Sequence, residues 1–194
     1  MKRAIDVAAA AVGLLVLLPL MLVLALLLCA TSPGPPLFRQ RRVGRHGREF
    51  GMWKFRTMVA EAERLRPLLL ARSRDADWLD LADDPRVTGV GRLLRRMSID
   101  ELPQLVNVLL GDMSLVGPRP LPVEEDARVP EWAAARSHVR PGITGLWQVR
   151  GRASVGFAEM LRLDCAYVRD PSLANDLRIL ARTVPAVLTA RGAR

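Results

Sequence analysis

The longest feature in the hydrophobic pattern is an apolar stretch near the N-terminus, because residues 7–30 contain no charged side chain. As a helix this stretch would be roughly 36 Å long, whereas the hydrocarbon core of a bilayer is only about 30 Å thick. A cleaved signal peptide is disfavoured, since its apolar region spans only about 7–15 residues and ends in small residues, whereas here Leu28 precedes Cys29. The pattern therefore predicts a membrane-embedded helix.

Two features of this stretch leave its topology open. Pro19 lies at its middle, where a proline removes a backbone hydrogen bond and bends a helix. Basic residues flank both ends, with Lys2 and Arg3 before the stretch and several arginines within residues 39–48 after it. Such flanks favour the cytoplasmic side of a membrane. A simple span and a re-entrant helix-break-helix, with its break at Pro19, both fit the pattern.

The next pattern is an alternation of apolar and polar positions that predicts a small β-hairpin. The sequence TSPGPP at residues 31–36 ends the apolar helix. Alternation then runs through residues 37–43 and 48–58, on both sides of GRHG at 44–47. At an anionic membrane surface each arginine of this hairpin would contribute about 1 kcal/mol of attraction.

Helical periodicity dominates the remainder of the chain. Helices are predicted at residues 60–74 (broken near Pro67), 90–96, 102–110, within 124–137, and amphipathically at 155–170 and 172–190. They are separated by an acidic connection at 75–86, a rigid loop at 111–122 and a turn-rich, extended segment at 139–152. The fold class is α-dominated α+β: a membrane-inserted helix and exit turn over residues 1–36, then a compact helical domain with amphipathic interfacial helices over 37–194.

Composition adds an expectation about partners. The chain has 194 residues, a formal net charge of +9 and a pI near 11.1, which favours an anionic partner such as phospholipid, a phosphorylated ligand or nucleic acid. Aromatic residues make up only 5%, which argues against a nucleic-acid platform. Cys29 and Cys165 have no metal or disulfide spacing, and His46 and His138 form no zinc motif.

Two adjacent acids, Asp100 and Glu101, stand out within SIDELPQL at residues 98–105. Ser98 and Glu101 fit an S-x-x-E capping box, which would give the acids a structural role. A helix beginning at Asp100 instead places Pro103 in the first turn, where its missing N–H is tolerated. Asp100 would then lie at a helix N-terminus, which stabilises an anion and attracts phosphate.

Two turn-rich motifs carry further candidate chemistry. Prolines on both sides of Arg119 in GPRP (117–120) stiffen the loop that presents its guanidinium, which suits a bidentate phosphate contact; a surface turn is the alternative. After the Pro-Gly turn of RPGITG (140–145), Trp147 and Gln148 could stack on and hydrogen-bond a base, although Trp147 equally fits a core. Few carboxylates beside a phosphorylated ligand suit Mg²⁺.

Taken together, these motifs closely resemble the bacterial sugar transferase family, the small monotopic phosphoglycosyl transferases. The resemblance covers nearly the whole chain except for residues 60–83 and 121–137, and DELPQLVNVLLGDMSLVGPRP is its longest contiguous motif. The other matching segments are KRAIDVAAA with the apolar run, SPGPPLFRQRRVGRHGREFGMWKFRTM, VRPGITGLWQVRGR and LDCAYVRDPSLANDLRIL. Longer relatives carry additional N-terminal spans, and this chain resembles the minimal catalytic form.

The resemblance implies a covalent mechanism that requires Mg²⁺. Asp100 matches the family's nucleophile, a position that also contacts the metal, and Glu101 matches its partner in the dyad. Arg119 matches a phosphate-contacting arginine. The remaining motif positions near the active site are Lys54, Arg95 and Gln148. Some members have a serine before the membrane proline, whereas this chain has Leu18, so the re-entrant bend depends on Pro19 and the flanking charges.

The resemblance also implies partners and a location. A sugar-1-phosphate would pass from a UDP-sugar to a membrane polyprenyl phosphate, with release of UMP, in a catalytic domain on the cytoplasmic face of the bacterial inner membrane. Inner-membrane phospholipid is then a partner and nucleic acid is not. A non-catalytic basic membrane-surface scaffold remains the alternative. The sequence leaves open the donor sugar, the glycan pathway and the oligomeric state, a homo-oligomer included.

Overall fold

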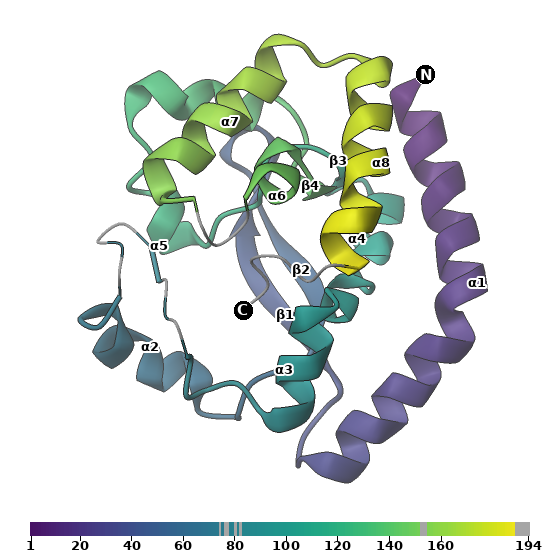
Figure 1. The fold of residues 1–194 in the computed structure, drawn as a ribbon, viewed down its shortest axis with the longest axis vertical. Coiled ribbons are helices and arrows are strands. Elements are labelled where there is room, and N and C mark those ends of the chain that lie inside the picture. Colours follow the sequence, from purple (N-terminus) through teal and green to yellow (C-terminus); the bar gives the residue numbers. More distant parts are fainter. Residues whose placement is uncertain (74, 76–77, 80, 82, 152–154, 189–194) are drawn as a thin grey trace.

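The computed structural model describes residues 1–73, 75, 78–79, 81, 83–151 and 155–188. It is a helix-dominated α+β structure in which one long N-terminal helix runs along the flank of the molecule (Figure 1). Its α-helices are α1 (Lys2–Thr31), α2 (Ala62–Leu70), α3 (Gly89–Arg96), α4 (Gln104–Leu110), α5 (Val123–Asp126), α6 (Leu146–Arg150), α7 (Phe157–Arg169) and α8 (Leu173–Leu188). Its strands are β1 (Leu37–Val43), β2 (Glu49–Phe55), β3 (Ser114–Val116) and β4 (Gly142–Thr144), and its 3₁₀ turns are η1 (Arg45–Gly47), η2 (Ile99–Glu101) and η3 (Glu131–His138). The predicted fold class is confirmed at this level.

Helix α1 is one continuous element with Pro19 inside it. The predicted division into two half-helices at Pro19 is therefore not seen. A proline inside a helix removes one i→i−4 hydrogen bond while the flanking bonds can persist, so the helix bends without ending. Figure 1 shows such a change of direction along α1.

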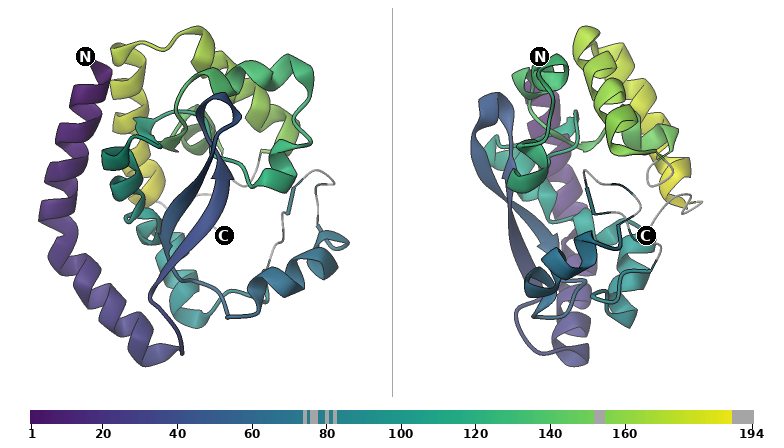
Figure 2. Two further views of the ribbon diagram at one scale, coloured as in Figure 1. Left: turned by 180° about the vertical axis from the view of Figure 1, so that it is seen from behind. Right: turned by 90° about the vertical axis from the view of Figure 1, so that its left-hand side faces the viewer.

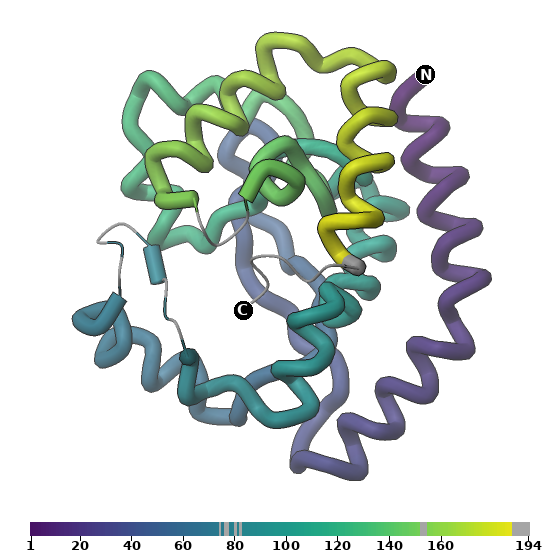
Figure 3. Tube along the Cα trace, viewed as in Figure 1, coloured from purple at the N-terminus to yellow at the C-terminus, as the bar shows by residue number. Residues whose placement is uncertain are grey.

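The first turn of α1 is tied to the rest of the protein by charged side chains. Lys2 forms an ion pair with Asp176 of α8, and Arg3 donates to the carbonyl oxygens of Val108 and Leu109 at the end of α4, at 2.6 and 3.1 Å. Asp6 is buried and accepts a 2.8 Å hydrogen bond from the hydroxyl of Ser114 in β3. The start of α1 and α8 consequently lie side by side, as the tube in Figure 3 and the ribbon in Figure 1 both show.

The remainder of α1 packs along one face and leaves the other face uncovered. Ala10 packs in a cluster with residues of β2 and α4, and Leu24 and Leu28 pack with Phe55 and Leu94. Many large apolar side chains on the opposite face are exposed, among them Leu15, at 76%, and Leu26, at 72%. Among the described residues, α1 is the one helix that is both long enough and apolar enough to cross a membrane. An apolar helix face of this size in contact with water is unfavourable, which favours association with a membrane.

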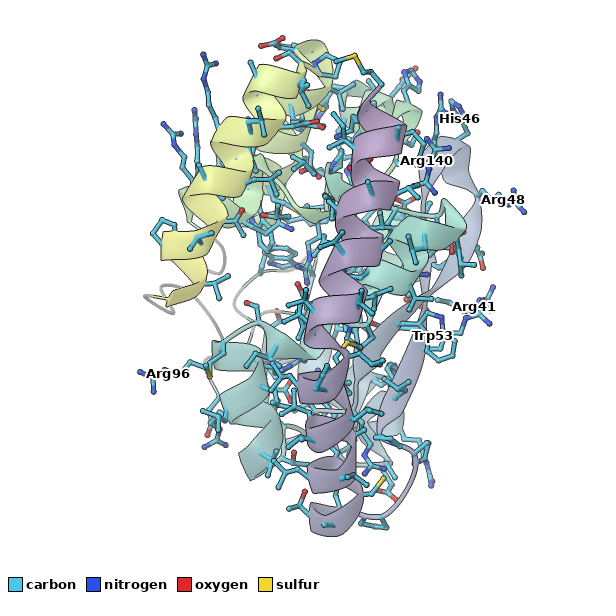
Figure 4. The ribbon with its side chains drawn as sticks, turned by 90° about the vertical axis from the view of Figure 1, so that its right-hand side faces the viewer. Arg41, His46, Arg48, Trp53, Arg96 and Arg140 are labelled. Carbon is cyan, nitrogen blue, oxygen red and sulfur yellow. The ribbon has the colours of Figure 1, made fainter. Side chains whose placement is uncertain are left out.

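The predicted hairpin is confirmed. Strands β1 and β2 pair antiparallel from Leu37 opposite Phe55 to Val43 opposite Glu49, and η1 forms the connection. His46 adopts a positive φ of 56° in this turn. Figure 4 shows basic side chains pointing outward from the hairpin. In the left view of Figure 2 the hairpin lies in front, across the middle of the fold, and in the right view it lies at the left-hand edge of the molecule.

Three details of the predicted secondary structure were wrong. Pro67 lies inside α2 and does not break it. The segment at 111–122 is not only a loop, because it contains β3, which pairs in parallel with β4 from the segment at 139–152. That second segment also contains helix α6, where an extended chain was predicted. The acidic connection falls partly outside the described residues, but Asp84 within it forms a 2.6 Å ion pair with Arg86, so this acid is not simply solvated.

Candidate active site

The two adjacent acids lie in the short 3₁₀ turn η2, which joins α3 to α4. Ser98 precedes the turn with a φ of 55° and forms no side-chain cap, so the alternative capping box does not exist. The predicted helix start at Asp100 is nearly right, because helical backbone begins at Ile99 but the α-helix itself begins only at Gln104. Pro103 is the N-cap of α4, where its missing N–H removes no helical hydrogen bond.

Lys54 connects the hairpin to this turn. It comes from β2, and its ammonium group donates a 2.8 Å hydrogen bond to a carboxylate oxygen of Glu101. Both side chains are mostly buried, with 16% and 26% of their surface exposed. This ion pair is therefore shielded from solvent more than a surface pair, and it fixes the position of Glu101 next to Asp100.

Asp100 is almost completely buried and surrounded by charge. Burial raises the pKa of its carboxyl group, and the negative charge of Glu101 raises it further, whereas Lys54 and Arg95 lower it. The pKa of Arg95 is itself lowered by burial, against the stabilising charge of Asp100. Burial therefore disfavours the charged form of Asp100, and a further positive charge nearby would stabilise it.

The GPRP motif follows β3 and is held by very close backbone packing. A Cβ atom added to Gly117 would lie 2.4 Å from the carbonyl oxygen of Arg140, and one added to Gly145 would lie 2.2 Å from the carbonyl oxygen of Gly117. At Gly142 the nearest atom, the nitrogen of Gly117, would be 2.1 Å away. Only glycine fits at these three positions, where the backbones at the ends of the parallel strands β3 and β4 approach each other closely.

The peptide of Arg119 is held by a buried ion pair that the sequence analysis did not identify. Arg136 donates to the carbonyl oxygen of Arg119 and, at 3.1 and 2.8 Å, to the carboxylate of Asp164. Asp164 also accepts a hydrogen bond from the backbone of Arg119. Burial raises the pKa of Asp164 to about 6, although both of these partners lower it. A charged residue inside the apolar stretch LRLDCAYV was the available signal.

The guanidinium group of Arg119 lies over the ring of Trp147, 4.8 Å from its centroid. Trp147 is buried in a core cluster with Trp78 and Phe157. The core role that the sequence analysis considered for this tryptophan is therefore confirmed. The Arg119 side chain is therefore positioned by a cation–π contact with the ring of Trp147, and its backbone is held by Arg136 and Asp164.

All of the predicted site residues line a single cavity of about 1340 Å³. They are Lys54, Arg95, Asp100, Glu101, Arg119 and Gln148. The same cavity is bordered by Gly13, Leu17 and Leu20 of α1, so it extends from the charged turn to the apolar helix. A cavity of this size accommodates a ligand larger than most drug-like molecules.

Several further basic residues line this cavity and were missed from the sequence: Arg42, Arg66, Arg86, Arg92 and Arg96. Arg42 is buried and donates a 3.0 Å hydrogen bond to the carbonyl oxygen of Pro120 in the GPRP motif. Burial, reinforced by the charge of Arg119, lowers the pKa of Arg42 to about 9. Arg92 and Arg96 are exposed, and Figure 4 shows Arg96 projecting outward from α3, so these two border the cavity at its solvent side. The composition showed an excess of arginine but could not tell which arginines face a common space.

The described residues contain no cluster of three or more histidine, cysteine or acidic side chains able to hold a metal alone. A preassembled zinc or calcium cage is therefore not part of the site that the structure describes. The paired carboxylates, the arginines and the neighbouring apolar helix instead give the cavity a charged end and an apolar border.

Comparison with known proteins gives the family. The chain belongs to the bacterial sugar transferase family, whose model matches residues 1–190. It is 48% identical over 197 residues to the UDP-glucose:undecaprenyl-phosphate glucose-1-phosphate transferase of Caulobacter vibrioides, and 43% identical over 199 residues to the exopolysaccharide production protein ExoY of Rhizobium meliloti. It is 41% identical over 198 residues to the undecaprenyl-phosphate galactose phosphotransferase of Salmonella typhimurium.

These alignments cover 97%, 98% and 100% of this chain, in the same order. They cover 70%, 87% and 41% of the relatives' own lengths, so the chain spans less than half of the Salmonella protein. The membership identifies the protein as a sugar-phosphate transferase enzyme, and the expected family resemblance is confirmed.

Proposed function

We propose that the protein transfers a sugar-1-phosphate from a UDP-sugar to a membrane polyprenyl phosphate and thereby begins the synthesis of a bacterial polysaccharide. The observation that supports this most is the shared cavity, which joins Asp100 and Glu101 to Arg119 and reaches the apolar helix α1. A polar donor and a lipid acceptor both have to reach one reacting group, and this cavity offers a charged end and an apolar border. The names of the relatives support the same donor and acceptor classes.

The reaction proceeds in two displacements at phosphorus. A carboxylate oxygen of Asp100 attacks the β-phosphorus of the donor, forming an O–P bond while the P–O bond to UMP breaks and UMP leaves with the electron pair. The intermediate is a phosphosugar joined to Asp100 as an acyl phosphate. An oxygen of polyprenyl phosphate then attacks this phosphorus, the bond to Asp100 breaks, and the carboxylate is regenerated.

The neighbouring residues have separate roles in this scheme. Arg119 and Arg95 offset the negative charge of the diphosphate, which would otherwise repel the attacking carboxylate. Lys54 holds Glu101 through the 2.8 Å ion pair, so that Glu101 can accept a proton from the acceptor phosphate. The burial of Asp100 excludes water from the intermediate.

The chemistry of the site fits Mg²⁺ as a cofactor. Magnesium prefers oxygen ligands, needs only one or two carboxylates, and takes further ligands from substrate phosphates. Asp100 and Glu101 are adjacent and line the cavity, and burial raises the pKa of Asp100, so a bound cation would offset the cost of its buried charge. These two residues would hold the ion, which when bound would supply positive charge to the diphosphate.

We further propose that α1 is re-entrant and that both its ends lie on the cytoplasmic face of the inner membrane. The support is the bend of the helix, the basic residues at both flanks, and the ion pair that ties Lys2 to Asp176 of the globular domain. An N-terminus that is held to α8 by this ion pair supports an arrangement with both on the same side of the membrane. Labelling a cysteine introduced at position 2 in intact cells tests this: access from the periplasm would contradict the re-entrant arrangement.

UMP release from purified protein tests the catalytic proposal. The protein in detergent or nanodiscs is mixed with Mg²⁺, polyprenyl phosphate and one UDP-sugar at a time, beginning with UDP-glucose and UDP-galactose. We expect UMP and a lipid-linked sugar diphosphate from at least one donor, and no UMP without Mg²⁺. If no donor in a broad panel releases UMP, the proposed transfer from a UDP-sugar is wrong.

A further inference from the structure

Three buried polar atoms around the cavity have no hydrogen-bond partner. Among the residues that the structure describes, they are the indole nitrogens of Trp78 and Trp147 and the side-chain oxygen Oε1 of Gln148. All three residues line the cavity that contains Asp100 and Glu101. A buried polar atom without a partner costs free energy, and native proteins rarely leave several together unless a ligand or water completes them. The three residues border one cavity, so their unpaired atoms are hydrogen-bonding groups that a ligand bound there could complete.

The orientation of the Gln148 amide shows which hydrogen bonds it has left to offer. Its nitrogen Nε2 donates to the carbonyl oxygen of Ile143 at 3.4 Å, so the amide nitrogen faces the backbone of β4. The unpaired group is consequently the oxygen, which can only accept. A Cβ atom on Gly145 would lie 2.9 Å from this oxygen, so the glycine at the start of α6 leaves the space that the acceptor occupies.

The two indoles add donors but no free stacking face at Trp147. Their rings meet edge to face, 5.9 Å apart at an angle of 68°, and the guanidinium group of Arg119 lies against the ring of Trp147. An indole nitrogen donates and cannot accept. The group that fits this part of the cavity therefore presents one N–H donor together with carbonyl acceptors along an edge, and binds through that edge.

We propose that Gln148, Trp147 and Trp78 form the subsite for the uracil base of the donor, an inference that rests on the proposed function. Uracil presents an N3–H donor between two carbonyl oxygens, which complements one amide acceptor and two indole donors. Cytosine presents an unprotonated N3 acceptor at the same position, facing the oxygen of Gln148 without a proton to share. Two acceptors in contact repel each other, so the subsite selects uridine nucleotides over cytidine nucleotides.

The position of Arg119 connects this subsite to the reacting end of the donor. Its guanidinium group contacts the ring of Trp147 and also lines the cavity beside Asp100 and Glu101. A nucleotide whose base lies at Gln148 can thus extend its phosphates past Arg119 toward the dyad. Base recognition and phosphate recognition are adjacent because the GPRP motif and α6 are joined through the β3–β4 pair.

Equilibrium binding of UMP and CMP to the full-length protein in nanodiscs tests the subsite. We expect the wild type to bind UMP at least about tenfold more tightly than CMP, since a site built to hydrogen-bond one group rejects the analogue that lacks it. Gln148→Met keeps the length of the side chain and removes the acceptor. It should weaken UMP binding by about tenfold or more, leave CMP binding nearly unchanged, and so remove the preference.

Gln104→Met is the matched control, because Gln104 is a buried glutamine that does not line the cavity. This variant should prefer UMP over CMP as strongly as the wild type does. Trp78→Phe, which keeps the aromatic ring and removes one donor, should weaken UMP binding by a smaller factor. Equal binding of UMP and CMP by the wild type, or an unchanged preference in Gln148→Met, would overturn the subsite. If UMP release from a UDP-sugar persists in that case, only the subsite is wrong; if it is also absent, the proposed function fails as well.

Discussion

Asp100 and Asp164 are two deeply buried carboxylates, but only Asp100 lines the cavity. Burial raises the pKa of both. Asp164 receives two hydrogen bonds from Arg136 and does not line the cavity, whereas Asp100 lines it and is surrounded by the charges of Lys54 and Arg95. A raised pKa alone therefore does not mark a nucleophile in this protein. Access to the cavity is what favours Asp100 as the proposed nucleophile, whereas the enclosed Asp164 holds the loop that presents Arg119.

The largest effect that distinguishes the two carboxylates is expected on turnover. Asp100→Asn removes the attacking charge at nearly constant shape, so UMP release should fall by about 10⁴-fold or more while the protein stays folded and membrane-bound. With a sugar-labelled donor and no acceptor, mass mapping of the wild type should find a phosphosugar on Asp100. Glu101→Gln should slow the complete reaction but still allow this adduct to form. An adduct on Glu101, or UMP release that requires the acceptor, would contradict the assignment.

Asp164→Asn should mainly affect stability. It leaves the buried guanidinium group of Arg136 without its closest charged partner, with only the 3.4 Å ion pair to the more exposed Asp126 remaining. This group cannot lose its proton, so the free energy of unfolding should fall by about 3–5 kcal/mol. Arg136→Met should cost less, because Asp164 can then take up a proton. Its pKa is already raised to about 6 and rises further without Arg136.

The sign of the pH dependence separates these two variants. A carboxyl group whose pKa is raised in the folded state contributes stability at low pH, and this contribution is lost as pH rises through the raised value. The deficit of Arg136→Met should accordingly shrink between pH 7 and pH 5, whereas that of Asp164→Asn should not. Denaturant unfolding of the detergent-solubilised proteins at both pH values provides the measurement, and equal pH dependence in the two variants would disprove the explanation.

A smaller effect is expected where the two regions meet, at Arg119. Arg119→Lys keeps the charge but loses the planar, two-pronged contact with phosphate and the contact with the ring of Trp147. We expect kcat/KM for the UDP-sugar to fall by about 10-fold to 100-fold with little change in unfolding. Near-normal kcat/KM in this variant would reduce GPRP to a structural turn.

The smallest predicted effect is a shift in a pH profile. Asp100 reacts only when ionised, so the rate of adduct formation should rise with pH through its pKa. Lys54 lowers that pKa, and Lys54→Met should therefore move the acidic limb of the profile to higher pH. Glu101→Gln removes a like charge that raises the same pKa and should move the limb to lower pH. Shifts in the same direction for both variants would show that another group controls the limb.

The sequence predicted those parts of the fold that depend on local pattern. The apolar run gave α1, strict alternation gave the β1–β2 hairpin, and the adjacent acids with their proline gave a helical turn at the site. The parallel pair of β3 and β4 was missed because each strand is only three residues long, and parallel pairing between distant segments leaves no local signal. Pro67 lies within a helix although the pattern predicted a break there.

The sequence pointed to the candidate site residues that belong to recognisable motifs, but not to the residues that support them. Asp100, Lys54 and Arg119 were identified because each belongs to a recognisable motif, and the structure brings the three together in one cavity. Arg42 and Arg136 were not identified, because an arginine is ordinarily exposed and only the tertiary structure shows that these two are buried. The sequence could not show that the Arg119 peptide is held between two opposite charges.

The close backbone packing at the ends of β3 and β4 determines where this enzyme tolerates redesign. At Gly117, Gly142 and Gly145 any side chain would overlap backbone atoms at 2.1–2.4 Å, and backbone cannot move aside as a flexible side chain can. A library intended to change the donor sugar should therefore keep these three glycines, and also Thr183, which hydrogen-bonds to Thr144 of β4 at 2.8 Å. It should vary cavity-lining side chains such as Val187 of α8. Variation there can reshape the cavity wall without disturbing the loop that holds Arg119.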